Sequence, residues 1–280
     1  MKILVAPQEF KGSISALSVA EAAETGVMRV FPEAEVVLCP VADGGDGTLE
    51  TLVEVSGGEV RTCSVQNPIG ETITAQWGAM GDGVTAVIEM ARTSGLALLS
   101  LDERDPLNSS TFGLGQAILE ALNQGFRKFI VGIGGSATND AGAGMAQALG
   151  ATLLNAEGKS IPFGGAALAD LRSIDISKMD TRIENSQFMV ACDVSNPLTG
   201  DEGASAVYGP QKGATPEMVA QLDNALLNFA EIVKKDIGKN VSEISGAGAA
   251  GGLGAGMLAF MGAELKAGVD IVLETVQLRE

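Results

Sequence analysis

The chain has 280 residues, and 46% of them are hydrophobic, which is enough to bury a sizeable core in one large domain or two smaller ones. It has 35 Asp and Glu against 18 Lys and Arg, a formal net charge of −17, which argues against a nucleic acid or an anionic membrane as its partner. It contains no histidine, so a Ser-His-Asp triad and histidine-ligated metals are excluded.

Short β-rich runs alternate along the chain with amphipathic helical patterns. The predicted elements are, in chain order, a strand over 2–6, a helix over 15–30, a strand over 35–40, a helix over 48–55, an antiparallel stretch over 59–90, a helix over 111–122, a strand over 128–133, a helix over 143–149, a strand over 188–193 and a helix over 215–235. The alternation predicts an α/β fold with parallel sheets in two subdomains.

The three cysteines lie far apart and form no Cys-x-x-Cys pair, so neither a disulfide framework nor a soft-metal site is expected, and a reducing cytoplasm fits. A metal would then be a hard cation on carboxylate oxygens, with magnesium as the first candidate. The uncharged stretch over 246–263 is rich in Gly and Ala and too weakly apolar to predict a membrane span.

The first of four glycine-rich segments, residues 41–48, leads from a predicted strand into a helix. Asp43 and Asp46 lie three residues apart there, beside Gly44 and Gly45. Paired carboxylates next to exposed backbone N–H groups suit magnesium and phosphate together. An Asp-Gly turn that caps a helix is the alternative, and composition alone favours it.

The second segment, residues 132–144, joins a buried strand to a helix through a loop rich in hydroxyl, amide and carboxylate groups. Such a loop has the geometry of a phosphate cradle, although it lacks the Gly-Lys-Ser/Thr of a Walker A motif. It also matches a loose dinucleotide fingerprint, with Glu157 twenty residues after Ala137. The candidate ligand residues of this loop are Gly134, Gly135, Ser136, Thr138, Asn139 and Asp140.

Four further positions are candidates. Asp193 ends a predicted strand and could bind metal or accept a hydroxyl proton, and Lys212 lies among glycines where it could steady phosphate. An Asx turn and a solvated lysine are the alternatives. The fourth glycine-rich segment contains Gly248 and Gly251, and predicts either close helix packing or a nucleotide platform.

Six blocks of this sequence, in family order and spread over nearly the whole chain, resemble the bacterial glycerate kinase family. They are Ala6-Pro7 with Phe10-Lys11-Gly12-Ser13, then residues 42–48, 132–140, 191–198, 209–213 and 246–252. The resemblance implies a transferase that uses ATP and Mg²⁺ to phosphorylate the organic acid D-glycerate, at the 2-hydroxyl, to give 2-phosphoglycerate. It also implies two α/β domains: a split flavodoxin-like one, with residues 1–60 as its first part and 265–280 as the start of its return, and an inserted one over 61–264, with the active site between them.

Within the matched motifs, Lys11 and Lys212 are expected near substrate carboxylate or phosphate. Asp43, Asp46 and Asp193 are candidates for magnesium binding, and the catalytic set is Asp43, Asp193, Lys11 and Lys212. Phosphoryl transfer needs only a weak base, because positioning and charge stabilisation do most of the catalysis. The sequence leaves open which carboxylate is the base, whether the 2- or the 3-hydroxyl reacts, and whether the protein forms a homo-oligomer.

Two departures from the family pattern keep alternatives open. Gln8-Glu9 stands where the family usually has Asp-Ser, and family members continue past residue 280 with another strand, glycine loop and helix. The chain is therefore interpreted as an active kinase, as a fragment or as a shortened, inactive relative that only binds ligand. A dinucleotide-dependent oxidoreductase is a weaker alternative, based on the two G-x-G-x-x-G/A matches.

Overall fold

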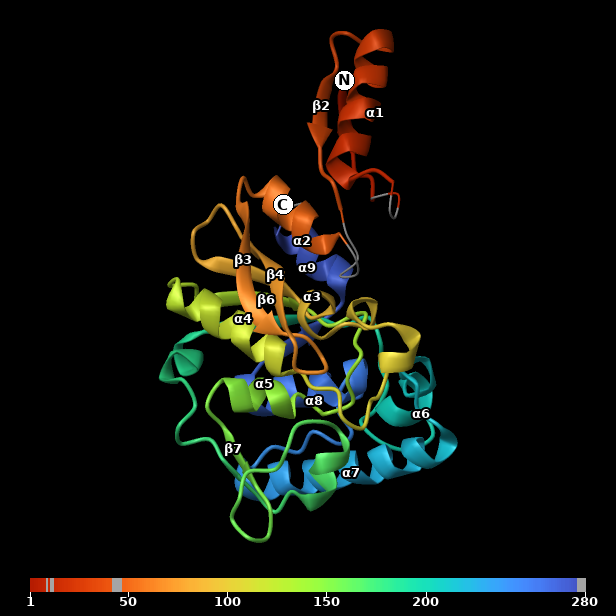
Figure 1. Cartoon of the computed structure of the whole chain (residues 1–280). Helices are drawn as coiled ribbons and strands as arrows, with labels where there is room; N and C mark the ends of the chain where they lie inside the picture. Colours follow the sequence, from red (N-terminus) through yellow and green to blue (C-terminus); the bar gives the residue numbers. More distant parts are fainter. Residues whose placement is uncertain (9, 11–12, 42–46, 276–280) are drawn as a thin grey trace.

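The computed structural model describes residues 1–8, 10, 13–41 and 47–275. Its first unit is a parallel pair of strands, β1 (Lys2–Val5) and β2 (Glu35–Leu38), joined through helix α1 (Ala16–Val30). The helix begins after Ser15, whose hydroxyl accepts a hydrogen bond from the backbone N–H of Ser18 at 3.2 Å, as expected of an N-cap. This unit stands at the top of Figure 1, apart from the main body.

The main body contains a six-stranded mixed sheet in the order β10-β9-β6-β5-β4-β3. The strands β3 (Glu59–Gln66), β4 (Thr72–Ala79) and β5 (Thr85–Glu89) pair antiparallel, as predicted for this stretch. The strands β5, β6 (Lys128–Gly132), β9 (Gln187–Ala191) and β10 (Glu264–Lys266) pair in parallel. A separate antiparallel pair, β7 (Thr152–Leu154) and β8 (Ser173–Asp175), was not predicted.

Helices cover both faces of the six-stranded sheet. Strand residues alternate between the faces, so that Phe129 and Val131 of β6 join one buried cluster and Ile130 joins the other. Helices α2 (Thr48–Val55) and α9 (Gly268–Thr275) pack on the face of Ile130 through Leu49, Leu52, Ile271 and other apolar side chains. The central strands β5, β6 and β9 are covered on both faces, which is why they are mainly apolar.

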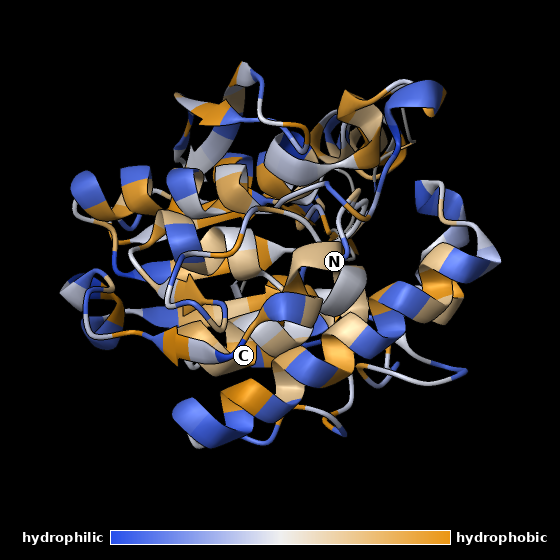
Figure 2. Cartoon of the chain, turned by 60° about the horizontal axis from the view of Figure 1, so that its bottom comes forward, coloured by the Kyte–Doolittle hydropathy of each residue, from blue (hydrophilic) through white to orange (hydrophobic). Residues whose placement is uncertain are grey.

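The larger cluster lies on the opposite face, under α4 (Phe112–Asn123), α5 (Ala143–Ala148), α7 (Pro216–Asp236) and α8 (Ala249–Met261). Phe129 and Phe188, which are register partners on β6 and β9, stack with ring centroids 4.6 Å apart. Figure 2 shows hydrophobic and hydrophilic residues alternating along the helices, as expected where one side of each faces a core.

Short helical segments complete the chain. They are α3 (Ala91–Ser94), α6 (Ala204–Tyr208) and the 3₁₀ turns η1 (Leu96–Leu98), η2 (Leu101–Glu103), η3 (Ala166–Asp170), η4 (Thr181–Asn185) and η5 (Pro210–Lys212). The predicted α/β class is confirmed, and each predicted strand or helix has an observed counterpart. The division into domains at 1–60 and 61–264 stays a prediction. Within the described residues, no helix combines the length and the apolar character that crossing a membrane requires.

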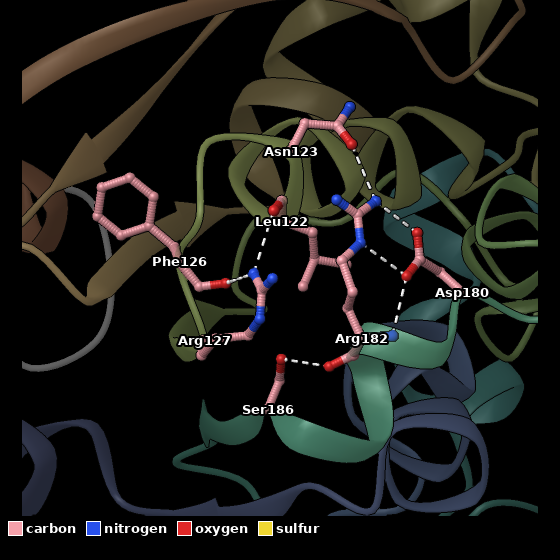
Figure 3. Close-up of polar contacts among 7 residues, drawn as sticks. All are labelled: Leu122, Asn123, Phe126, Arg127, Asp180, Arg182 and Ser186. Carbon is pink, nitrogen blue, oxygen red and sulfur yellow. Dashed lines mark hydrogen bonds and ion pairs between the residues drawn. The ribbon is translucent and has the colours of Figure 1, made fainter.

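A polar network fastens the edge of the sheet where β6 and β9 begin (Figure 3). The Arg182 guanidinium donates to Asp180 at 2.8 Å and to the side-chain oxygen of Asn123 at 2.9 Å. The Arg127 guanidinium donates to the carbonyl oxygens of Leu122 and Phe126, at 3.1 and 2.6 Å. These bonds give the Leu122 carbonyl at the C-terminal end of α4 a hydrogen-bond partner, and they join α4 to η4. At this edge, where the parallel strands begin, the arginine side chains are hydrogen-bonded to other groups of the protein.

Candidate active site

The opposite edge, where the parallel strands end, holds a cavity of about 300 Å³. Glu89, Gly132 and Ala191 are register partners at the ends of β5, β6 and β9, so the loops that follow these strands leave the sheet side by side. Ligands of open α/β sheets bind at this carboxyl edge. The lining residues are Ile133, Gly134, Gly135, Ser136, Ala191, Cys192, Asp193, Val194, Tyr208, Gln211, Ala249 and Ala250.

The loop after β6 is held in place by backbone bonds to the segment 94–96. The N–H of Leu96 donates to the carbonyl of Gly135 at 2.9 Å, and the N–H of Ala137 donates to the carbonyl of Ser94 at 3.0 Å. Gly135 has a φ of +69°, a conformation that favours glycine. A side chain at Gly134 would meet open space within 4 Å, so the cavity reaches the backbone at this point.

Lys212 reaches this loop from η5 and is completely buried. Its ammonium donates to the Ser136 hydroxyl oxygen at 2.7 Å and to the Thr138 carbonyl at 2.6 Å. Burial lowers the pKa of Lys212 to about 7, and the nearby Asp140 carboxylate acts in the opposite direction. The predicted loop residue and the predicted lysine are therefore brought together, and the solvated-lysine alternative is wrong.

Asp140 closes the same loop and lies within the protein. Its carboxylate accepts from the N–H and the hydroxyl of Thr111 at 2.8 and 2.9 Å, and from the N–H groups of Gly142 and Gly144 at 3.1 and 3.2 Å. Burial raises the pKa of the Asp140 carboxyl, while these four bonds act to lower it. Asp140 thus joins the loop to the starts of α4 and α5, and it does not line the cavity.

Thr138 and Asn139, which directly precede Asp140 on the polar loop, are also fully buried. The side-chain amide of Asn139 donates to the Ser205 hydroxyl at 3.0 Å. The Thr138 hydroxyl and the side-chain oxygen Oδ1 of Asn139 have no hydrogen-bond partner among the described residues. Buried polar atoms without a partner are costly, so they are concentrated where a structure serves a purpose beyond its own stability.

Asp193 contributes an exposed carboxylate to the cavity wall from the loop after β9. One of its oxygens accepts from the backbone N–H of Gly268 at 2.9 Å, at the start of α9. Beside it, the thiol of Cys192 donates to the Val194 carbonyl at 3.3 Å, and burial raises the pKa of this thiol. An oxygen ligand of this kind is the donor that magnesium prefers.

The glycines of the fourth segment, residues 246–252, let the start of α8 approach the loop after β6 and the loop after β9 closely. A Cβ at Gly251 would lie 2.0 Å from the Thr138 carbonyl oxygen, and one at Gly248 would lie 2.0 Å from the Pro197 carbonyl oxygen. Neither glycine lines the cavity, whereas Ala249 and Ala250 do. Ala250 has a φ of +54°, a strained conformation for a residue with a Cβ.

Five predicted site residues lie outside the described residues. They are Lys11, Asp43, Gly44, Gly45 and Asp46. The described chain resumes at Gly47, whose φ is +82°, and Thr48 begins α2. Within the described residues there is no group of three or more His, Cys, Asp or Glu side chains that could hold a metal ion.

Sequence reasoning missed a charged cluster at the end of β5. The Arg92 guanidinium donates to Glu89 at 2.6 Å, to Glu50 at 2.6 Å and to the Gln76 side chain at 2.7 Å. Burial raises the pKa of Glu89, against the effect of Arg92. The cluster borders a second cavity of about 530 Å³. A carboxylate that ends a buried strand, the signal used for Asp193, could have identified Glu89.

A model of the glycerate kinase family matches residues 3–280. Glycerate 2-kinase of Escherichia coli K12 is 51% identical over 280 residues, which is all of this chain and 74% of that protein. Glycerate kinase of Bacillus subtilis 168 is 52% identical over 99% of this chain and 72% of its own length.

Among solved structures, the crystal structure of "putative glycerate kinase 2" from Salmonella typhimurium LT2 superposes with a TM-score of 0.97 at 49% identity, over 99% of this chain and 74% of that one. These comparisons confirm the predicted family and the α/β fold. They give no support to the dinucleotide-dependent oxidoreductase or to the inactive relative. A family match over nearly the whole chain and relatives about half identical show that this chain is a kinase and belongs to the glycerate kinase family.

Proposed function

We propose that the chain transfers the γ-phosphoryl group of ATP to the 2-hydroxyl of D-glycerate, in the cavity at the carboxyl ends of β6 and β9. The observation that carries this location is that a glycine loop and an exposed carboxylate line one cavity, with a buried lysine bound to that loop. A volume of about 300 Å³ is at the lower end of small-molecule sites. The similar Escherichia coli protein is named a glycerate 2-kinase, which supports the choice of the 2-hydroxyl.

Phosphoryl transfer is catalysed mainly by positioning and by stabilising charge. In the proposed reaction the substrate hydroxyl oxygen forms a bond to the γ-phosphorus as the bond to the ADP oxygen breaks, and the hydroxyl proton passes to a carboxylate. The backbone of the loop after β6 receives phosphate oxygens, because glycine at 134 and 135 lets a ligand approach the main chain closely. Asp193 is the described carboxylate of the cavity.

Magnesium fits the donors at this edge, since it is usually held by one or two carboxylates together with substrate phosphates. Asp193 would hold it, and Asp43 and Asp46 remain predicted ligands outside the described residues. When bound, magnesium neutralises part of the phosphate charge. The three cysteines are free, which supports a reducing compartment such as the cytoplasm.

The test is ADP release by this chain with MgATP and D-glycerate, read against a control without glycerate. ³¹P NMR of the product distinguishes 2-phosphoglycerate from 3-phosphoglycerate. Turnover that depends on glycerate and yields the 2-phosphate is expected. ADP release that does not depend on glycerate would refute the acceptor, and a 3-phosphate product would refute the position.

A variant tests the location. Asp193→Asn keeps the side-chain oxygen that accepts from the Gly268 N–H, so the fold should be retained. Turnover should fall by about a hundredfold or more, the range for loss of a general base. Asp201→Asn, an exposed position that does not line the cavity, is the matched control. Equal turnover in both variants would remove Asp193 from the mechanism.

A further inference from the structure

The contact between Lys212 and Ser136 fixes the direction of one hydroxyl proton. A lysine ammonium has three donors and no acceptor, so the Ser136 oxygen must accept in the 2.7 Å bond. The single proton of that hydroxyl cannot point at the ammonium. It must be directed to another acceptor.

The cavity is the place where the Ser136 hydroxyl can donate a hydrogen bond. Ser136 lines the cavity while being only 6% exposed, so its hydroxyl lies at the boundary between protein and ligand space. The Thr138 carbonyl of the same loop already accepts from Lys212 at 2.6 Å. Among the described residues, no hydrogen bond donated by the Ser136 hydroxyl is present. An acceptor in the cavity would therefore complete its hydrogen bonding.

The charge distribution around Lys212 favours an anionic acceptor. Within the described residues the Lys212 ammonium forms no ion pair with a carboxylate, although the group is fully buried. Asp140 faces it from the loop but gives its oxygens to four other donors. On the η5 side, the Arg104 guanidinium donates to the Gln211 carbonyl at 3.2 Å, and Asp193 stands at the cavity wall. Among the residues that the structure describes, the positive charge thus lacks a close counter-ion.

We propose that Ser136 donates a hydrogen bond to an anionic oxygen of the bound ligand, phosphate or carboxylate, and that Lys212 is the positioning residue that turns this hydroxyl toward the cavity. The proposal rests on the proposed function, which places the kinase site in this cavity. Lys212 acts through Ser136 and does not itself contact the ligand. A buried cation that polarises a hydroxyl strengthens its bond to an anion, because the local dielectric constant is low.

A pH dependence follows from the donor pattern. Below its pKa of about 7 the ammonium only donates, and Ser136 must donate outward. Above this pH the neutral amine also accepts, so the hydroxyl proton can turn inward and the ligand loses a donor. The kcat/KM of the unaltered chain, which reports the free enzyme, should therefore fall as the pH rises through this range. Ser136→Ala has no hydroxyl to turn, and this fall should be absent.

The binding experiment measures the affinities of MgADP and of D-glycerate separately by titration calorimetry. Ser136→Ala should weaken one of the two about ten- to a hundredfold, the range for a hydrogen bond to a charged group. The ligand that responds shows whether phosphate or carboxylate is the acceptor. Lys212→Met should weaken the same ligand, and the double variant should bind it no more weakly than Ser136→Ala alone, because the two residues act as a unit.

Lys239→Met is the matched control. Its ammonium also donates to two backbone carbonyls, those of Leu258 and Ala259 at 2.9 and 3.0 Å, but it does not line the cavity. This variant should lose stability and keep both affinities. If Lys212→Met does not fold, the pH profile of Ser136→Ala decides the question without it.

The outcomes separate the two proposals. Glycerate-dependent turnover with unaltered affinities in Ser136→Ala would overturn the role of Ser136 and leave the function standing. A double variant weakened by the product of the two single effects would show that Lys212 acts independently of Ser136, and would overturn its positioning role. An unaltered chain that binds neither ligand would overturn the proposed function together with this inference.

Discussion

The closest approach between α8 and the site loop can be tested by adding one methyl group at Gly251. The ideal Cβ of an alanine there would lie 2.0 Å from the Thr138 carbonyl oxygen and 2.7 Å from the Asn139 Cα. Ordinary contact of a carbon with such atoms needs about 3.5 Å, so the two backbones must separate by more than about 1 Å. The carbonyl that would move is the one that accepts from Lys212 at 2.6 Å.

The cost has two parts. Gly251 has a φ of +71°, and an L-residue in this region costs about 1–2 kcal/mol. Overpacking against fixed neighbours typically costs a further ~1–3 kcal/mol. We therefore expect Gly251→Ala to lower the free energy of unfolding by about 2–5 kcal/mol.

Gly83→Ala separates the two parts. Gly83 also has a φ of +71°, but a Cβ there would meet nothing within 4 Å. It should carry only the conformational cost, and the unfolded-state effect of adding a methyl group is the same in both variants. The difference between the variants, about 1–3 kcal/mol, is the cost of the clash.

Urea unfolding followed by the fluorescence of Trp77 is a suitable assay. Trp77 is the single tryptophan of the chain, is fully buried, and lies in the same apolar cluster as Leu253 and Ala255 of α8. Free energies come from linear extrapolation, with the slope compared between variants. Equal losses of stability in Gly251→Ala and Gly83→Ala would show that the close approach contributes nothing, and the reasoning would fail.

Three further predictions concern the cavity, the charged cluster and the buried lysine. Gly134→Val should fold normally, because a side chain there meets open space, and should weaken MgADP or glycerate binding in calorimetry; unchanged affinity for both would contradict the location of the site. Arg92→Met leaves Glu89, which is only 6% exposed, without its cation, and should lower the free energy of unfolding in urea by about 3–5 kcal/mol. Adding Glu89→Gln should restore most of this loss. A double variant as unstable as Arg92→Met would argue against the ion pair. Lys212 has a pKa of about 10.5 in the unfolded chain and about 7 in the folded protein, so the unfolded chain binds more protons between these pH values. The stability of the unaltered chain relative to Lys212→Met should therefore rise with pH in this range, by up to ~1.4 kcal/mol per pH unit. Parallel stability profiles of the two proteins would contradict the lowered pKa.

Local patterns carried most of the secondary structure. The helix predicted over 215–235 is α7, and the Thr215 hydroxyl accepts from the Met218 N–H at 3.3 Å, as expected of an N-cap followed by proline. The apolar runs over β6 and β9 predicted buried strands, because a strand covered on both faces does not alternate between apolar and polar residues. The short pair β7 and β8 has three residues in each strand, too few for a periodic signal.

Burial of polar groups could not be predicted in the same way. Lys212 among glycines is compatible with a solvated side chain, and its burial depends on the loop after β6 arriving from a distant part of the chain. Asp140 was expected to face a ligand, but its carboxylate accepts four hydrogen bonds from the protein. Two come from Thr111 and two from the backbone N–H groups of Gly142 and Gly144. Partners that are distant in sequence leave no mark on the local pattern.

The net charge of −17 and an anionic substrate are reconciled by the distribution of charge. Net charge governs long-range attraction, whereas binding inside a cavity depends on the groups that surround it. Lys212 places a cation behind the cavity wall, where it forms no ion pair with a carboxylate of the described residues. The acidic surface has little effect on this local field, because exposed charges are screened by salt within about 10 Å. One buried lysine can therefore matter more to ligand binding than the whole surface charge.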